Sequence, residues 1–288
     1  MNARRLGRCT VFALAFFVPV FAAAQSRVRP EPRYAFTGKV DQQEGRRLLA
    51  DFRRLGLTGD YALDFTLRAM PRRGEERTVA GRMYGTRNDI GPMTLVEFPP
   101  DTPGARRILV QNGPQSAVWT VPVDGAAAAV VGPEQLFTPL AGTDLTAFDL
   151  QMPFLFWEDC VFEGVVSVRG RPAHRFLAYP PPEVAAARPT LTGVRFYLDT
   201  QFLALVQAEE LGPDATTVKT ISVLDLKRTQ DQWIVRSIDL RDEATRNKTR
   251  FHIVGAALNL QLPRVVFSPD HLPVSPELGA EVQVAPFR

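Results

Sequence analysis

The sequence predicts a mainly β protein with few helices, built as a large curved antiparallel sheet or barrel of about 11–12 strands with an apolar segment as a lid. Short segments in which apolar and polar residues alternate recur along the chain, as expected for strands with one buried face. Most gaps between these segments are too short for the crossover helix that parallel strands require. One apolar stretch with three prolines, residues 133–157, interrupts the alternation and predicts the lid.

The N-terminus has the pattern of a secretory signal peptide. Three arginines lie within the first eight residues, an apolar run spans residues 11–21, and three alanines follow at 22–24. The run is short for a membrane span, so an uncleaved anchor fits less well. We therefore expect residues 1–24 to be cleaved and residues 25–288 to form a single exported domain.

The charge of the chain changes when this leader is removed. The 288 residues contain 34 Lys+Arg and 31 Asp+Glu, a formal charge of +3. The leader holds three of the arginines and no acid, so the mature chain is balanced. Because nucleic-acid binding needs a positive surface, we expect no nucleic-acid partner.

Residues for covalent or metal chemistry are sparse. The mature chain retains one cysteine, Cys160, which we interpret as a half-buried apolar residue. Three scattered histidines offer little for a metal site, and motifs of lipases, nucleotide-binding loops and zinc proteases are absent. We therefore expect no enzyme, no catalytic residues, no metal and no cofactors. An exported hydrolase that uses His174 or His252 is the least favoured alternative.

One helix is predicted near the start of the mature chain. Leu48, Leu49, Phe52 and Leu55 recur at helical spacing from Asp41 onward, and glycines end the run. Arginines occupy the opposite side of this helix, which we interpret as a solvated face.

Strands dominate the rest of the chain. Leu63, Phe65 and Leu67 alternate with polar residues, which predicts a strand whose apolar side chains line the concave face of the sheet. A proline-rich loop is expected at 180–189. Further strands are predicted at residues 77–85, 93–98, 107–111, 116–122, 162–169, 173–179, 194–199, 202–208, 218–226, 233–240 and 249–254.

The stretch 133–157 carries more apolar residues than a surface connection usually does, at no period of two, and short helices fit it best. It must cover something apolar. If it is held loosely, acyl chains can replace it in a cavity; the alternative is that it fills the core permanently. The lid or rim residues expected to contact lipid are Phe137, Leu140, Phe148, Phe154 and Phe156, together with Leu63, Phe65 and Leu67 of the concave face.

Several loose motifs follow one another in a characteristic order over nearly half of the chain. The motifs are the segment GTDLTAFDL at 142–150, the strand, Gly-x-Pro hairpin and strand at 166–179, the strand FYLD at 196–199, the turn at 212–214 and the ending FSPDHL at 267–272. In the order of these motifs, the chain resembles the outer-membrane lipoprotein-sorting proteins of the LolA/LolB-like superfamily.

The resemblance implies an incomplete barrel with a helical lid and an apolar cavity that receives lipid or lipoprotein acyl chains. It implies a non-enzymatic periplasmic carrier or chaperone for lipoprotein sorting to the outer membrane, with an inner-membrane transporter as a further partner. It does not transfer individual binding residues to this chain. The alternative is an envelope-stress sensor or interaction module built on a similar barrel.

Overall fold

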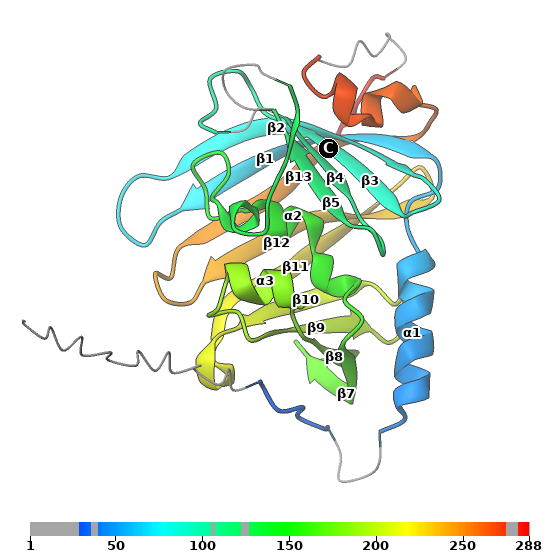
Figure 1. The fold of residues 1–288 in the computed structure, drawn as a ribbon. Helices are drawn as coiled ribbons and strands as arrows, with labels where there is room; N and C mark the ends of the chain where they lie inside the picture. Colours follow the sequence, from blue (N-terminus) through cyan, green and yellow to red (C-terminus); the bar gives the residue numbers. More distant parts are fainter. Residues whose placement is uncertain (1–28, 36–39, 105–106, 122–126, 275–281, 288) are drawn as a thin grey trace, which may run out of the picture.

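One antiparallel sheet forms the frame of the molecule (Figure 1). The computed structural model describes residues 29–35, 40–104, 107–121, 127–274 and 282–287. In these residues the sheet has fourteen strands in the order β6-β5-β4-β3-β2-β1-β13-β12-β11-β10-β9-β8-β7, and β14 pairs with β13. β6 and β7 do not pair with each other, so the curved sheet stays open. This confirms the predicted incomplete antiparallel barrel.

The strands are β1 (Asp60–Met70), β2 (Arg77–Arg87), β3 (Pro92–Glu97), β4 (Arg107–Gln111), β5 (Ala117–Thr120), β6 (Ala129–Val130), β7 (Cys160–Val168), β8 (Arg171–Ala178), β9 (Gly193–Asp199), β10 (Leu205–Leu211), β11 (Thr217–Thr229), β12 (Gln232–Asp242), β13 (Lys248–Leu260) and β14 (Ala285–Pro286). The α-helices are α1 (Gln42–Arg54), α2 (Ala147–Gln151) and α3 (Pro182–Ala187), and the 3-10 helices are η1 (Gln135–Phe137), η2 (Pro153–Leu155), η3 (Pro213–Ala215), η4 (Arg264–Phe267) and η5 (Pro269–His271).

The strand count exceeds the prediction of about 11–12 because β6 and β14 have only two residues each, too few to show a period. β10 begins three residues later than predicted. The cause is Asp199, whose Oδ1 accepts hydrogen bonds from the amides of Gln201 and Phe202, both at 2.9 Å, and holds the chain in a turn before the strand.

The predicted helix is α1, and the loop expected at 180–189 contains a second one. The Asp41 carboxylate accepts a hydrogen bond of 2.8 Å from the amide of Gln43 and caps α1. In the expected loop, the short helix α3 forms because Pro182 occupies its first turn, where a missing amide hydrogen costs nothing. In the described part of the chain, no helix is long and apolar enough to cross a bilayer.

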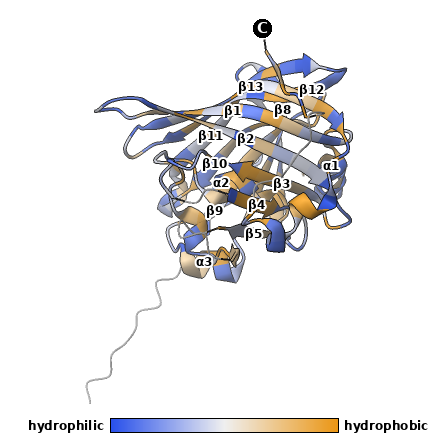
Figure 2. Cartoon of the chain, turned by 90° about the horizontal axis from the view of Figure 1, so that it is seen from above, coloured by the Kyte–Doolittle hydropathy of each residue, from blue (hydrophilic) through white to orange (hydrophobic). Residues whose placement is uncertain are grey.

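The two faces of the sheet have separate cores. On β1, Leu63, Phe65 and Leu67 point to the larger core, and Ala62 points to the smaller one. We call these the inner and outer faces. Residues 133–157, the lid, and α1 cover the inner face, whereas residues 262–272, the C-terminal cover, pack on the outer face. Figure 1 shows α2 and the C-terminal cover on opposite sides of the strands β1–β5, and Figure 2 shows the hydrophobic ribbon around β3, β4 and α2.

Candidate functional site: the lid and its cavities

The lid connects the two unpaired ends of the sheet. It leaves the sheet after β6 and rejoins it at β7, so it crosses the inner face, with η1, α2 and η2 as the predicted short helices. Phe148 is the centre of its packing: the ring centroid lies 4.8 Å from that of Phe137, 6.0 Å from that of Phe154 and 6.1 Å from that of Trp157.

All eight residues proposed from the sequence to contact lipid gather in or against the inner core. Phe137 and Phe156 lie at its edge and are partly buried. The buried six are Leu63, Phe65, Leu67, Leu140, Phe148 and Phe154. Phe148 is 0% exposed and Phe154 is 1% exposed, so these two side chains form the interior of the lid rather than its rim. Lipid contact by any of the eight stays a prediction.

An apolar cavity of ≈ 200 Å³, the inner cavity, separates α2 from the sheet. Asp149 is the only polar residue among those that line it. The apolar residues are Leu145, Leu150 and Met152 from the lid, and Met83, Ile221, Val235, Ile238, Leu240, Phe251 and Ile253 from the sheet.

A larger pocket of ≈ 720 Å³, the seam pocket, lies beside the lid, between β5–β6 and the start of α3. The lid contributes Gln151, Pro153, Phe156 and Trp157 to its lining, and Val118 comes from β5. The lid therefore borders two pockets, the inner cavity and the seam pocket.

Lys219 on β11 ties the first half of the lid to the sheet. Its ammonium forms a buried ion pair with Oδ2 of Asp149 and donates a hydrogen bond of 2.9 Å to the carbonyl oxygen of Asp144. Oδ2 of Asp149 also accepts hydrogen bonds from the amide and hydroxyl of Thr146, at 2.8 and 2.7 Å, which closes a capping box on α2.

Glu210 on β10 adds a second buried carboxylate to this region. Burial, followed by the negative charge of Asp149, raises the pKa of Glu210 to about 7, although Lys219 and Arg188 oppose this rise. Nη1 of Arg188 lies 3.0 Å from Oε2 of Glu210, and the same guanidinium stands 4.5 Å above the ring of Phe137. The lid is therefore linked to β10 and β11 through charged groups.

Arg53 at the end of α1 ties the second half of the lid. Its Nε donates a hydrogen bond of 2.7 Å to the carbonyl oxygen of Leu155, and its Nη2 donates one of 3.3 Å to that of Trp157. Burial lowers the pKa of Arg53. The lid is thus held by Lys219 and by Arg53, and also by Thr249 on β13, whose hydroxyl accepts a hydrogen bond of 3.1 Å from the amide of Asp144.

The sequence analysis missed Lys219, Glu210 and Arg53. For the two strand residues a signal was present: Lys219 lies two positions before the inner-facing Ile221, and Glu210 two positions after the inner-facing Ala208. A charged residue at a strand position whose side chain points to the apolar face indicates a buried polar site.

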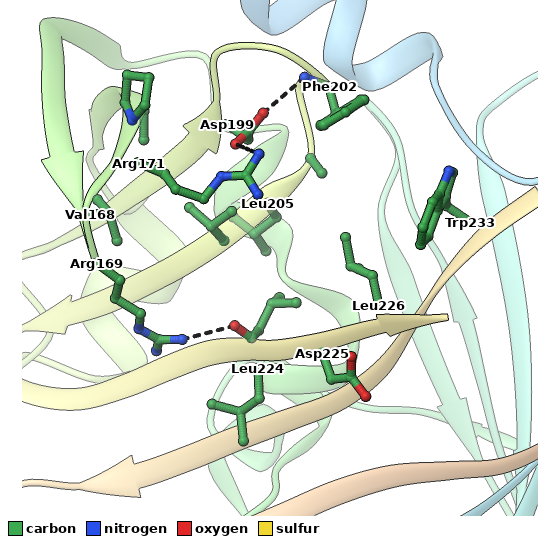
Figure 3. Close-up of a pocket in the computed structure, with 15 residues that line it drawn as sticks. Val168, Arg169, Arg171, Asp199, Phe202, Leu205, Leu224, Asp225, Leu226 and Trp233 are labelled. Atoms are coloured by element: carbon green, nitrogen blue, oxygen red, sulfur yellow. Dashed lines mark hydrogen bonds and ion pairs between the residues drawn. The ribbon is translucent and has the colours of Figure 1, made fainter. Parts of the chain in front are cut away.

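A third pocket, of ≈ 530 Å³, lies between the β7–β8 hairpin, the β9–β10 turn, β11 and the start of β12 (Figure 3). Figure 3 shows Arg169 and Arg171 on one side of it and Phe202, Leu226 and Trp233 on the other. Phe202 is 58% exposed and Trp233 is 61% exposed. This pocket is an apolar surface that a partner molecule can reach.

Cys160, His174 and His252 differ in their surroundings, and Nδ1 of His174 is buried without a hydrogen-bond partner among the described residues. Burial raises the pKa of the Cys160 thiol to about 12, which agrees with an apolar role. His174 packs against Phe162, and Nδ1 of His252 is 2.7 Å from the hydroxyl oxygen of Ser237. Among the described residues no carboxylate hydrogen-bonds to His252, so the third member of a catalytic triad is missing there.

The open antiparallel sheet of this chain, crossed on its inner face by a short-helical segment, is a LolA-like fold by its match to solved structures. No family model and no curated protein matches the sequence, so the likeness comes from structure. At 14–15% sequence identity it shows the fold alone.

Three solved structures share the fold. A protein from Vibrio parahaemolyticus, assigned as an outer membrane lipoprotein-sorting protein domain, has a TM-score of 0.68 and 15% identity, and the match covers 81% of this chain and 100% of the other. A DUF1329 family protein from Desulfovibrio piger has a TM-score of 0.67 and 14% identity, with 80% and 98% covered. A LolA superfamily protein from Nitrosomonas europaea has a TM-score of 0.58 and 14% identity, with 81% and 100% covered.

Proposed function

We propose that this protein is a periplasmic carrier that binds lipid or lipoprotein acyl chains between its lid and the inner face of its sheet, for lipoprotein sorting to the outer membrane. One observation carries the proposal: an apolar segment crosses the inner face of the sheet, borders two pockets and is held there by polar ties. The LolA-like fold supports the same function.

The inner cavity is too small for this cargo, so binding requires the lid to move. Pockets that hold small molecules measure about 300–1,000 Å³, and the inner cavity measures ≈ 200 Å³. The seam pocket, at ≈ 720 Å³, gives the lid room to shift away from the sheet. In that position the lid side chains remain in contact with apolar surface.

The energies allow this exchange. Breaking a buried ion pair costs about 3–5 kcal/mol, and each buried methylene contributes about 0.8 kcal/mol. About four to six methylenes therefore offset the loss of the tie between Lys219 and Asp149. A dodecyl chain exceeds this number, and a cargo with two or three chains exceeds it severalfold.

The proposal is tested by filling the inner cavity. Val235 lines it, so Val235→Trp inserts an indole where acyl chains are proposed to bind. We expect a fluorescent fatty-acid probe to bind the wild-type protein and to bind Val235→Trp at least about tenfold more weakly. Val274→Trp makes the same change at a position that is 61% exposed, and it should bind like wild type.

Native mass spectrometry of the protein purified from membranes gives an independent readout. Bound lipid is expected in the wild-type spectrum and a reduced amount in that of Val235→Trp. A wild-type protein that is free of lipid and also fails to bind the probe contradicts the proposal.

A second candidate function is an envelope-stress sensor or interaction module, and the third pocket favours it. The exposed Phe202 and Trp233 rim this pocket, as anchors of a protein interface often do. In this case Trp233→Ala should abolish capture of a defined protein partner from envelope extracts and leave probe binding unchanged. For the carrier, Trp233→Ala should leave lipid content unchanged.

The cellular setting belongs to the same proposal. Residues 1–24, the expected signal peptide, lie outside the described residues. We propose that they direct export to the periplasm, that residues 25–288 act as one domain, and that an inner-membrane transporter supplies the cargo.

A further inference from the structure

The two oxygens of the Asp149 carboxylate have different surroundings. Oδ2 accepts hydrogen bonds from three donors, namely the amide and hydroxyl of Thr146 and the ammonium of Lys219. Oδ1 is buried as well, yet no donor among the described residues reaches it. The side chain as a whole is 1% exposed. Half of this carboxylate is therefore shielded from solvent with its hydrogen-bonding capacity unused.

This oxygen belongs to the residue that gives the inner cavity its only polar lining. Every other residue around the cavity is apolar, so no neighbouring side chain there can donate to Oδ1. A buried acceptor without a donor destabilises a fold, and such groups are rare in native proteins. A polar group placed in an apolar ligand site commonly fixes the orientation of the ligand.

The local charge favours a donor that is positively charged. The carboxylates that interact here are those of Asp149, Glu210 and Asp242, and the cations are Lys219 and Arg188. Asp149 and Asp242 balance Lys219 and Arg188 in charge, and Glu210, whose pKa is raised to about 7, adds a partial negative charge near neutral pH. Arg188 is also partly exposed, so its charge is partly screened by solvent.

We propose that Oδ1 of Asp149 accepts a hydrogen bond from an N–H group of the cargo, so that the site selects acyl compounds carrying an N–H donor, above all a primary ammonium, over compounds that lack one. This inference rests on the proposed carrier function and names the cargo class of the same site. The acyl chain fills the space between α2 and the sheet, and the nitrogen lies at Asp149.

Two amphiphiles with the same chain and the same charge test this proposal. Dodecylammonium carries three N–H donors, and dodecyltrimethylammonium carries none. Each displaces the fluorescent fatty-acid probe from the wild-type protein below its micelle concentration. A hydrogen bond to a charged group supports a preference of at least about tenfold for dodecylammonium.

A pair of double variants separates hydrogen bonding from the larger size of the trimethyl group. Asp149→Leu with Lys219→Met removes the acceptor and its cation together, so no unpaired charge is left buried. In this variant the tenfold preference should disappear, so that the two amphiphiles bind about equally. Asp64→Leu with Arg82→Met removes an ion pair on the outer face, where Nε of Arg82 is 2.5 Å from Oδ1 of Asp64, and should keep the preference.

The outcomes distinguish the role of Asp149 in selecting the cargo from the carrier function itself. Equal displacement by the two amphiphiles in the wild type overturns the role of Asp149 and leaves the carrier function intact. A preference that persists in the Asp149 variant, with a cooperative thermal transition as proof of folding, also overturns it, because size then explains the selection. Failure of the probe and of both amphiphiles to bind rejects the carrier function itself.

Discussion

The lid and the C-terminal cover are two short-helical segments that pack on opposite faces of one sheet, and their polar anchors differ. The cover is anchored by Asp60, whose two oxygens are both used: Oδ1 accepts a hydrogen bond of 2.5 Å from the hydroxyl of Thr86, and Oδ2 accepts one of 2.8 Å from the amide of Leu262. The lid is anchored by Asp149, which leaves Oδ1 without a donor in the described structure.

The packing of the lid and the packing of the C-terminal cover differ as well. The cover lies on the outer core through Val266, Phe267 and Leu272. The lid borders the inner cavity and the seam pocket. A segment whose anchoring carboxylate is fully hydrogen-bonded suits a permanent cover, whereas a segment that borders two pockets and has an unused acceptor suits one that moves. The predictions below test this difference.

The largest effect is expected for Lys219→Met. The change leaves the carboxylate of Asp149 buried without its cation, which should lower the free energy of lid opening by about 3–5 kcal/mol. Hydrogen exchange at the amides of Leu150 and Met152 should accelerate about 10²- to 4 × 10³-fold. Exchange at the amides of Val266 and Ser268 in the cover should change little. Equal acceleration in both segments would show that the lid does not open separately.

The next effect is a pH dependence set by Glu210. Its pKa of about 7 in the folded protein lies above the ordinary value of 4.5, so the folded state holds this proton more tightly than the unfolded state. The resulting stability is complete below pH 4.5 and is lost as pH rises to about 7, at a cost of about 3 kcal/mol. Urea unfolding of wild type and Glu210→Gln from pH 4.5 to 8 measures this difference. Parallel pH profiles for the two proteins would contradict it.

Arg53→Met should have a smaller effect. It removes the two hydrogen bonds to the carbonyl oxygens of Leu155 and Trp157, worth about 2 kcal/mol together because Arg53 is only partly buried. Exchange at the amides of Leu155 and Phe156 should accelerate about thirtyfold. Arg54→Met is the matched control, since Arg54 is exposed and pairs only with Asp51 next to it on the helix. If both variants behave alike, Arg53 does not hold the lid.

The smallest effect is expected for Thr146→Ala. It removes the hydroxyl that caps α2, which should lower the free energy of unfolding by about 1 kcal/mol. Thr146→Ser keeps the hydroxyl and should recover most of the loss. Identical melting curves for the Ala and Ser variants would show that the capping box does not stabilise α2.

Local patterns made the sheet predictable and left its closure undetermined. The alternation of Leu63, Phe65 and Leu67 identifies β1 because each side chain contacts the inner core and its neighbours do not. The pairing of β1 with β13, which joins Asp60 to Leu260, links positions far apart in sequence, and no local pattern encodes it. The 3-10 turns of the cover lack a period for the same reason that β6 does: they are too short.

The candidate site was predictable as a segment but not as a set of contacts. The apolar density of residues 133–157 marked the lid, and its prolines indicated short helices. The ion pair between Asp149 and Lys219 spans seventy residues, so only the fold brings the two together. The cavity itself is a packing defect, and its existence depends on how side chains meet across the sheet.

Hydrogen exchange of the wild-type protein with and without an acyl ligand tests the central claim, that the lid opens separately to admit acyl chains. Without ligand, amides of residues 145–157 should exchange at least about a hundredfold faster than those of residues 262–272. Adding dodecylammonium should change exchange in the lid alone. Equal protection of both segments, unaltered by the ligand, would contradict the account and identify the lid as a permanent part of the core.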